Sequence, residues 1–295
     1  MPRPIRIAAA AYPFDWHDDL ASYEAKIADW VGKASDCDLL VFPEYGAMEL
    51  ASLGGPAVAG DLGQSLAEAA RHETARDAIH ARLAAEHGCH ILAASGPAFS
   101  VDGGQPVNRA VLFGPQGRIG HQDKQIMTRF ERDEWDVTGA PGLRIFDTPV
   151  GRLGVVICYD SEFPLLARQL AEAGAEILLA PSCTDSVAGF NRVRIGSMAR
   201  ALESQCVVVH APTVGNCDWN PAIDENRGRA SIYGPPDGLW PETGIIAEGE
   251  MDAPGWIKAT IDLDRIAESR RDGRVLPFAH WPESAIAAKL GIAKG

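Results

Sequence analysis

The sequence predicts a single-domain α/β fold. Short apolar runs rich in Val, Ile, Leu and Ala recur along all 295 residues, and most are bounded by Gly, Pro, Asn or Asp, which is typical of buried strands. Longer stretches with helical spacing separate several of these runs, and strands that alternate with helices favour a layered α/β fold. The Pro- and Gly-rich patches are short enough to be loops, so we expect no linker between two halves.

Nine segments are expected to form strands, and four longer ones are expected to form helices. The strand segments are residues 5–12, 37–43, 89–96, 109–114, 153–159, 175–182, 206–213, 230–234 and 256–263. The helical segments are residues 17–34, 64–87, 165–173 and 191–204. In the first helical segment, one face carries the apolar residues Leu20, Tyr23, Ile27, Trp30 and Val31.

The composition fits a globular protein with a sizeable core, because 46% of the residues are hydrophobic and 23% are charged. The chain has 40 Asp and Glu residues but 27 Lys and Arg residues, so its formal net charge is −13. With no cluster of basic residues, nucleic acid and anionic membrane surfaces are disfavoured as main partners. The chain has no run of about 18 apolar residues and no signal-peptide pattern at its start, so we expect a cytoplasmic protein.

The histidines and cysteines do not predict a metal or redox site. None of the six cysteines forms a Cys-x-x-Cys pair, which disfavours a zinc ribbon or a thioredoxin-type centre. The segment His87-Gly-Cys89-His90 lies at an expected helix-to-strand junction. Side chains on opposite faces of a strand cannot reach one ion, so we expect no metal there.

Cys158 ends one of the expected strands. The segment from Leu153 to Pro164 reads Leu-Gly-Val-Val-Ile-Cys-Tyr-Asp-Ser-Glu-Phe-Pro, which predicts a buried strand, a tight turn, and a helix starting near the proline. A cysteine at such a turn meets the positive end of a helix, where its thiolate is favoured, as a nucleophile requires. The alternative is a buried core cysteine, which is the more common case for a free cysteine.

Two further candidates carry charges. Glu44, in Phe42-Pro-Glu-Tyr45, follows an apolar run, and at the end of a strand it could serve as a general base if burial raised its pKa. Lys124 follows another expected strand and could stabilise an oxyanion, while Glu131, seven residues on, could hold it. The alternatives are a helix-capping or solvent-facing glutamate and a solvated surface lysine.

The order of these three segments resembles that of the nitrilase, or carbon–nitrogen hydrolase, superfamily. The matching segments are Phe42-Pro-Glu44, Lys124 with Glu131-Arg132, and the stretch 154–164 with Cys158-Tyr159-Asp160. Gly174-Ala175 before a strand and the segment Arg200-Ala-Leu-Glu203 are also similar. The resemblance extends from the first expected strand to beyond residue 260. No Walker, dinucleotide-binding or Gly-x-Ser-x-Gly motif is present in the sequence.

The resemblance implies a four-layer αββα sandwich and an amide-cleaving thiol hydrolase. It makes Cys158 the nucleophile, Glu44 the general base, Lys124 the oxyanion-side cation and Glu131 a fourth catalytic residue, with the backbone N–H of Tyr159 facing the oxyanion. No metal or organic cofactor is implied. Tyr159-Asp160 is typical of the amidase and carbamoylase branches, whereas nitrilases have Trp-Glu there. Nitrile hydrolysis, acyl transfer to an amine and a non-catalytic binding module on the same fold remain as alternatives.

The substrate and the assembly are less defined by the sequence. We expect a small-molecule amide, held by loops that mix aromatic, cationic and small polar groups, with Arg129 or Arg132 as possible partners of a substrate carboxylate. The resemblance also implies a homodimer or larger homo-oligomer. The catalytic sandwich should cover about residues 5–270, and the apolar tail of about residues 275–295 would suit a subunit interface. The pocket loops are expected to contribute Tyr45, Arg129, Trp135, Thr184 and Asn216.

Overall fold

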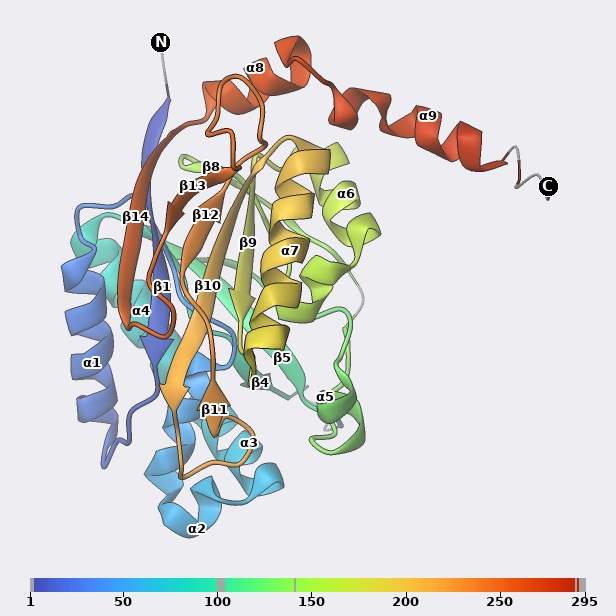
Figure 1. Ribbon diagram of the computed structural model, residues 1–295. Coiled ribbons are helices and arrows are strands. Elements are labelled where there is room, and N and C mark those ends of the chain that lie inside the picture. Colours follow the sequence, from blue (N-terminus) through green and yellow to red (C-terminus); the bar gives the residue numbers. More distant parts are fainter. Residues whose placement is uncertain (1–2, 100–103, 141, 290, 292–295) are drawn as a thin grey trace.

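Two β-sheets lie face to face, and helices cover the outer face of each (Figure 1). This arrangement is that of a computed structural model, which describes residues 3–99, 104–140, 142–289 and 291. The four-layer αββα sandwich expected from the sequence is therefore confirmed.

The first sheet is built around the N-terminal strand. Its strands are β14 (Gly255–Asp262), β1 (Pro4–Pro13), β2 (Leu39–Val41), β3 (His90–Leu92), β5 (Val107–Gly114), β4 (Gly96–Ala98) and β6 (Gly117–Asp123). Strands β1, β2 and β3 run parallel, β5 runs against them, and β6 runs against β5. Consequently β6 points the same way as β2, and their carboxyl ends lie at the same edge.

The second sheet continues from the first. Its strands are β7 (Ile145–Thr148), β8 (Gly151–Val155), β9 (Ile177–Ser182), β10 (Val207–Asn216), β12 (Ser231–Tyr233) and β13 (Ile245–Glu248), and the short β11 (Glu225–Asn226) pairs with the end of β10. Strands β8, β9 and β10 are parallel, and β10 pairs in parallel with the end of β1 at Tyr12 and Thr213. The two sheets are thus joined at one edge.

Side-chain alternation along the strands makes the layers, because successive side chains in a strand point to opposite faces. Along β1, Ile7 and Ala9 face the second sheet, whereas Ala10 and Tyr12 face helices. Along β9, Leu179 faces the first sheet and its neighbours in sequence face the opposite helical layer. Strands buried on both faces explain why the apolar runs in the sequence are continuous.

The helices form two outer layers (Figure 1). The first sheet is covered by α1 (Leu20–Lys33), α3 (Leu62–Arg71) and α4 (Glu73–His87), with the 3₁₀ helix η1 (Gly46–Gly54) and α2 (Pro56–Ala59) beside them. The second sheet is covered by α6 (Pro164–Glu172) and α7 (Val187–Ser204). The remaining helices are α5 (Arg129–Asp133), η2 (Cys158–Glu162), α8 (Asp264–Asp272) and α9 (Pro277–Lys289).

Some expected elements have other bounds in the structure: the strand expected over 89–96, for example, contains β3 and only the first residue of β4. Two further elements contain an unexpected break. Residues 64–87 form two helices rather than one, because His72 has a ψ of 4° and caps the end of α3 and the start of α4. The strand expected over 153–159 ends at Val155, and the chain turns into η2 at Cys158. No glycine or proline marks either break, so turn-forming residues gave no signal for them.

The C-terminal helix α9 extends away from the sandwich (Figure 1), and none of its described residues is buried. Its first turn contacts α6 and α8 through Phe278, whose ring lies 4.7 Å from the Arg168 guanidinium and 4.3 Å from that of Arg270. Within the described ranges, no helix combines the length and the apolar character needed to cross a membrane.

Candidate active site

Four segments bring their residues to one edge of the two sheets. Glu44 lies three residues after β2, Lys124 directly follows β6, Cys158 lies three residues after β8, and Cys183 directly follows β9. Because these strands all point the same way, their carboxyl ends converge, which is where α/β sheets bind ligands. The structure thus brings together residues that are up to 139 positions apart in sequence.

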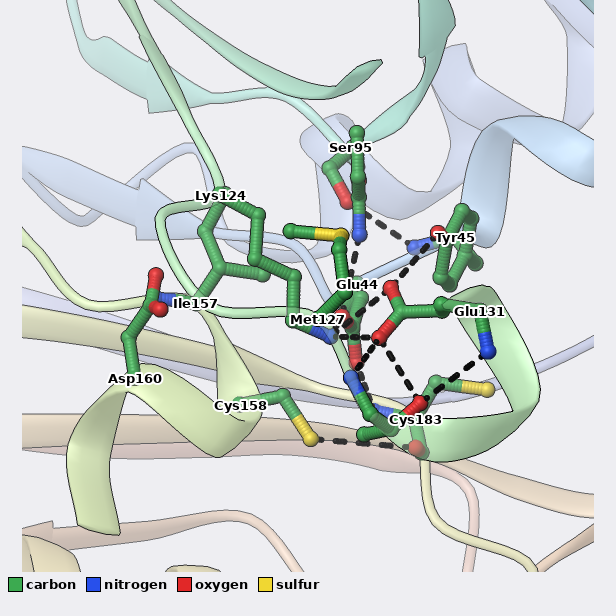
Figure 2. Close-up of polar contacts among 12 residues, drawn as sticks. Glu44, Tyr45, Ser95, Lys124, Met127, Glu131, Ile157, Cys158, Asp160 and Cys183 are labelled. Carbon is green, nitrogen blue, oxygen red and sulfur yellow. Dashed lines mark hydrogen bonds and ion pairs between the residues drawn. The ribbon is translucent and has the colours of Figure 1, made fainter. Parts of the chain in front are cut away.

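A buried ammonium lies between two carboxylates (Figure 2). Lys124 Nζ is 2.7 Å from Glu44 Oε1 and 2.8 and 2.7 Å from the two oxygens of Glu131. The side chains of Lys124 and Glu44 are each only 1% exposed. Burial lowers the pKa of Lys124, but the charges of Glu131 and Glu44 outweigh it and hold the pKa well above its ordinary value. The lysine therefore stays cationic.

Glu131 is fixed in place from three sides. The hydroxyl of Tyr45 donates to its Oε1 at 2.8 Å, and the backbone N–H and hydroxyl of Thr128 donate to its Oε2, each at 2.9 Å. Thr128 in turn caps α5, so the short helix begins with a reciprocal capping box. Burial raises the pKa of Glu131, but Lys124 more than offsets this and leaves the pKa below its ordinary value. Glu131 is therefore the ionised partner of the lysine.

Glu44 has a different electrostatic environment. Its Oε1 also accepts from the side-chain amide of Asn108 at 3.0 Å, and its Oε2 accepts from the backbone N–H of Cys183 at 2.9 Å. Burial raises the pKa of Glu44 to about 7, with the negative charge of Glu131 adding to the effect and Lys124 opposing it. A carboxyl group with a pKa near neutrality can both take and return a proton.

The Cys158 side chain lies in a strained turn beside this network. Its φ of 47° is in the left-handed region, which costs a non-glycine residue about 1–2 kcal/mol. Its Sγ lies 3.8 Å from the carbonyl oxygen of Cys183 (Figure 2). Strain of this kind persists only where the surrounding structure imposes it, and it is common at functional sites.

The environment of Cys158 opposes the thiolate that its turn was expected to favour. Burial, followed by the nearby charge of Glu44, raises the pKa of the thiol well above its ordinary value. The sequence-based argument relied on a helix N-terminus, but the helix that begins at Cys158 is η2, with only five residues, and α6 starts at Pro164. The sulfur is thus a thiol that needs a base to take its proton.

Asp160 ties the turn at Cys158 to the loop after Lys124. Its carboxylate accepts from the backbone N–H of Ile126 at 2.9 Å and, at longer distances, from those of Gln125 and Ile157. The residue is 1% exposed, and burial raises its pKa to about 6. Sequence reasoning assigned no role to Asp160, although it lies in the motif that carried the resemblance.

These residues open onto a cavity of about 270 Å³. Its lining includes the expected pocket residues Tyr45, Trp135, Tyr159 and Thr184. Tyr45 also serves the network itself, since its hydroxyl is bonded to Glu131. The residues of the cavity lining that carry polar or charged side chains are Glu44, Tyr45, Lys124, Thr128, Glu131, Trp135, Cys158, Tyr159, Glu162, Cys183, Thr184, Asp185, Arg192, Asp224 and Glu225.

Three residues expected at the substrate do not line this cavity. One is Arg132, whose Nε donates to the backbone carbonyl of Met127 at 2.9 Å. The side chain of Arg129 is 96% exposed and pairs with Asp133 at 3.6 Å. It precedes Glu131 by two positions, about 200° around the helix, so it points outward when Glu131 points in. Asn216 ends β10 and is exposed. The arginine that does line the cavity is Arg192, which pairs with Glu162 at 3.3 Å.

Asn108 is a second residue that sequence reasoning missed. It is completely buried on β5 and reaches Glu44, 64 positions earlier. A polar residue near the start of an otherwise apolar run was the available signal, because a buried amide needs hydrogen-bond partners. As for metals, no group of three or more His, Cys, Asp or Glu side chains is arranged to hold an ion within the part of the chain that the structure describes.

Comparison with known proteins gives a consistent result. Residues 6–271 match the carbon–nitrogen hydrolase family. The chain is 32% identical over 276 residues to the probable hydrolase YhcX of Bacillus subtilis, a match that covers 92% of this chain and 52% of the relative. It is 36% identical over 124 residues to the deaminated glutathione amidase of Rattus norvegicus, covering 42% of this chain and 35% of that enzyme. The matches thus span about half and about a third of the lengths of these two relatives.

The fold has a solved counterpart. The crystal structure of Saccharomyces cerevisiae Nit3, described as a member of branch 10 of the nitrilase superfamily, matches with a TM-score of 0.71 and 20% identity. That match covers 91% of this chain and 94% of the yeast protein. The family match over nearly the whole chain shows that this protein belongs to the carbon–nitrogen hydrolase family.

Proposed function

We propose that this protein hydrolyses a non-peptide carbon–nitrogen bond of a small amide through a thioester on Cys158. The observation that carries the proposal is a buried lysine shared by two carboxylates beside a strained cysteine in one cavity. This arrangement supplies a nucleophile, a base with a pKa of about 7 and a fixed cation. The rat relative is named an amidase, which favours an amide over a nitrile.

In the first half-reaction, Glu44 takes the proton of the Cys158 thiol while the sulfur attacks the amide carbon. The resulting oxyanion lies near the ammonium of Lys124 and the backbone N–H of Tyr159. Glu44 then returns the proton to the nitrogen, the carbon–nitrogen bond breaks, and ammonia or an amine leaves a thioester. In the second half-reaction, Glu44 takes a proton from water, which attacks the thioester, and returning that proton to sulfur releases the acid.

Glu131 has a supporting role in this scheme. Its carboxylate compensates the charge of Lys124, so that the lysine remains protonated in the dry site. It also adds negative charge beside Glu44 and so helps keep the pKa of that base near neutrality. The two glutamates therefore have different roles: Glu44 takes up and releases a proton, whereas Glu131 stays ionised.

A screen for ammonia release tests the proposal. Small amides, carbamoyl amino acids and nitriles are offered to the wild-type protein and to Cys158→Ala, with Cys89→Ala as a control for loss of a buried cysteine remote from the cavity. We expect release from at least one amide by the wild type and by Cys89→Ala, and none by Cys158→Ala. Release that persists in Cys158→Ala, or no release from any compound, would refute the proposal.

Oligomerisation remains a prediction from the resemblance. The test is the sedimentation behaviour of the full chain compared with a chain that ends at Arg274. If α9 joins subunits, the shortened chain should form smaller particles. An unchanged particle size would show that the tail does not hold the subunits together.

A further inference from the structure

The side chain of Asn108 contacts the candidate base directly. It is completely buried on β5, and its amide nitrogen donates to Glu44 Oε1 at 3.0 Å. The backbone carbonyl of the same residue accepts from the backbone N–H of Lys124 at 2.9 Å. Asn108 therefore joins the base to the strand that carries the lysine, without itself lining the cavity.

The two carboxylate oxygens of Glu44 accept different numbers of hydrogen bonds. A carboxylate oxygen has two favourable directions for accepting hydrogen bonds. At Oε1 both are taken, one by Lys124 at 2.7 Å and one by Asn108. At Oε2 one is taken by the backbone N–H of Cys183 at 2.9 Å, and the other remains. A proton that is transferred to Glu44 therefore binds to Oε2.

The orientation of the Asn108 amide supports this count. Rotating the amide by half a turn would place its oxygen against Glu44 Oε1, so that two acceptors would face each other in a buried site. In the observed orientation Asn108 Oδ1 has no hydrogen-bond partner among the residues that the structure describes. The observed orientation therefore leaves one buried acceptor unpaired while the amide donor reaches Glu44.

We propose that Asn108 is a positioning residue that confines the exchangeable proton of Glu44 to Oε2. This inference rests on the proposed function, because it assigns the oxygen through which Glu44 exchanges protons with Cys158 and the leaving nitrogen. Asn108 acts through Glu44 and does not touch the substrate. Without its amide, Oε1 can accept a proton and the carboxyl group can rotate.

The test is the rate at which iodoacetamide alkylates Cys158, measured by mass spectrometry at pH values on both sides of 7. The wild-type rate should rise as Glu44 loses its proton. Asn108→Ala removes a donor that stabilises the ionised carboxylate, so the rise should move to higher pH by about one unit. In steady-state assays, kcat should fall by about tenfold or more while KM changes little, because the substrate pocket is intact.

A second variant has nearly the same shape. In Asn108→Asp, the new carboxyl group can donate to Glu44 only while it is protonated, and once ionised it repels the base. The rise in the alkylation rate of this variant should therefore lie at a higher pH than in the wild type. This signature does not depend on how well Asn108→Ala folds.

The control is Gln205→Ala, which removes another buried amide, one that bonds to the carbonyls of Ser269 and Val275 away from the cavity. It should leave the pH profile of Cys158 alkylation unchanged. Asn108 variants with wild-type pH profiles would overturn this inference alone. A wild-type Cys158 that reacts no faster than the other cysteines at any pH would overturn the proposed function instead.

Discussion

Two lysine–glutamate clusters lie in the interior of the part of the chain that the structure describes, and the cluster around Lys124, unlike the one around Lys26, lines the cavity that contains Cys158. In the first, Lys124 is bonded to Glu44 and Glu131 at the edge of the sheets. In the second, Lys26 of α1 pairs with Glu49, which lies five residues after Glu44 and is completely buried. Both clusters contain a tyrosine hydroxyl bonded to a glutamate, so their chemical groups are nearly the same.

The difference lies in how the charges are balanced and what lies beside them. In the second cluster, Glu49 is surrounded by donors from Tyr12, from the backbone of Asp15 and from Lys26. Neither Glu49 nor Lys26 lines the cavity that contains Cys158. Lys26 also pairs with Asp15, but that carboxylate is 59% exposed, whereas both carboxylates that share Lys124 are buried. In the first cluster, burial together with the charge of Glu131 therefore keeps the pKa of Glu44 near neutrality against the opposing effect of Lys124. A buried ion pair therefore indicates function only where an excess charge, a nucleophile and a cavity accompany it.

The largest expected effect comes from removing each lysine in turn. Lys124→Met should reduce activity by at least about a thousandfold, because the oxyanion loses its cation and two buried carboxylates lose their partner. Lys26→Met should cost about 3–5 kcal/mol of unfolding free energy, because it leaves a buried carboxylate unpaired, yet the folded fraction should keep its activity. Urea unfolding and ammonia-release assays on both variants measure this difference. Equal loss of activity per folded molecule would remove the distinction between the clusters.

Neutralising the second carboxylate should have a smaller effect. Glu131→Gln keeps the shape of the side chain but removes the charge that helps to raise the pKa of Glu44. The acid limb of kcat/KM should therefore move to lower pH, while kcat falls by about ten- to a hundredfold because Lys124 is less firmly held. A pH–rate profile measures both changes. An acid limb that stays in place would show that Glu131 does not influence the base.

The pH dependence of the wild-type protein follows from the same balance. The pKa of Glu44 is raised by burial to about 7, so the fraction of the ionised base falls as the pH drops through that value. We expect kcat/KM to decline below about pH 7, approaching a tenfold loss per pH unit. A profile that stays flat well below this pH would mean that Glu44 is not the base.

The smallest expected effect is at Arg129. Its side chain is almost fully exposed and pairs only with Asp133, and exposed pairs contribute about 0–1 kcal/mol. Arg129→Ala should therefore change kcat/KM by less than about twofold. Arg192→Ala, at the cavity, is the matched comparison and should change KM with any anionic or cationic substrate. A large loss with Arg129→Ala would indicate that α5 rearranges during the reaction.

The sequence predicted the strands that precede Glu44 and Cys158, because each is a recognisable apolar run, but not β6, which leads to Lys124 and carries few apolar residues. Their meeting at one edge then follows from parallel strands. The burial that raises the pKa of Glu44, and the pairing with Lys124 that opposes it, could not be predicted, because both depend on how segments far apart in the chain pack together. The thiolate at Cys158 was expected on the basis of a helix dipole, whereas the structure has burial and a nearby carboxylate instead.

The supporting residues were harder to predict for a physical reason. Asn108 donates to the side chain of Glu44, and Asp160 accepts from backbone N–H groups. Because these contacts are within the protein and not with a ligand, the residue types alone gave no signal for them. Arg129 was misplaced because the sequence does not define the rotation of a five-residue helix. The break at His72 escaped notice because helix ends without Gly or Pro depend on tertiary contacts.

The claim that Glu44 activates Cys158 is tested most directly by mapping iodoacetamide alkylation over all six cysteines in the native protein at neutral pH. We expect Cys158 to react much faster than the other five, and Glu44→Gln to slow the alkylation of Cys158 alone by at least about a hundredfold. In Glu49→Gln, Cys158 should be alkylated as fast as in the wild type. If Cys158 reacts equally fast with and without the Glu44 carboxylate, the two residues do not form a catalytic pair.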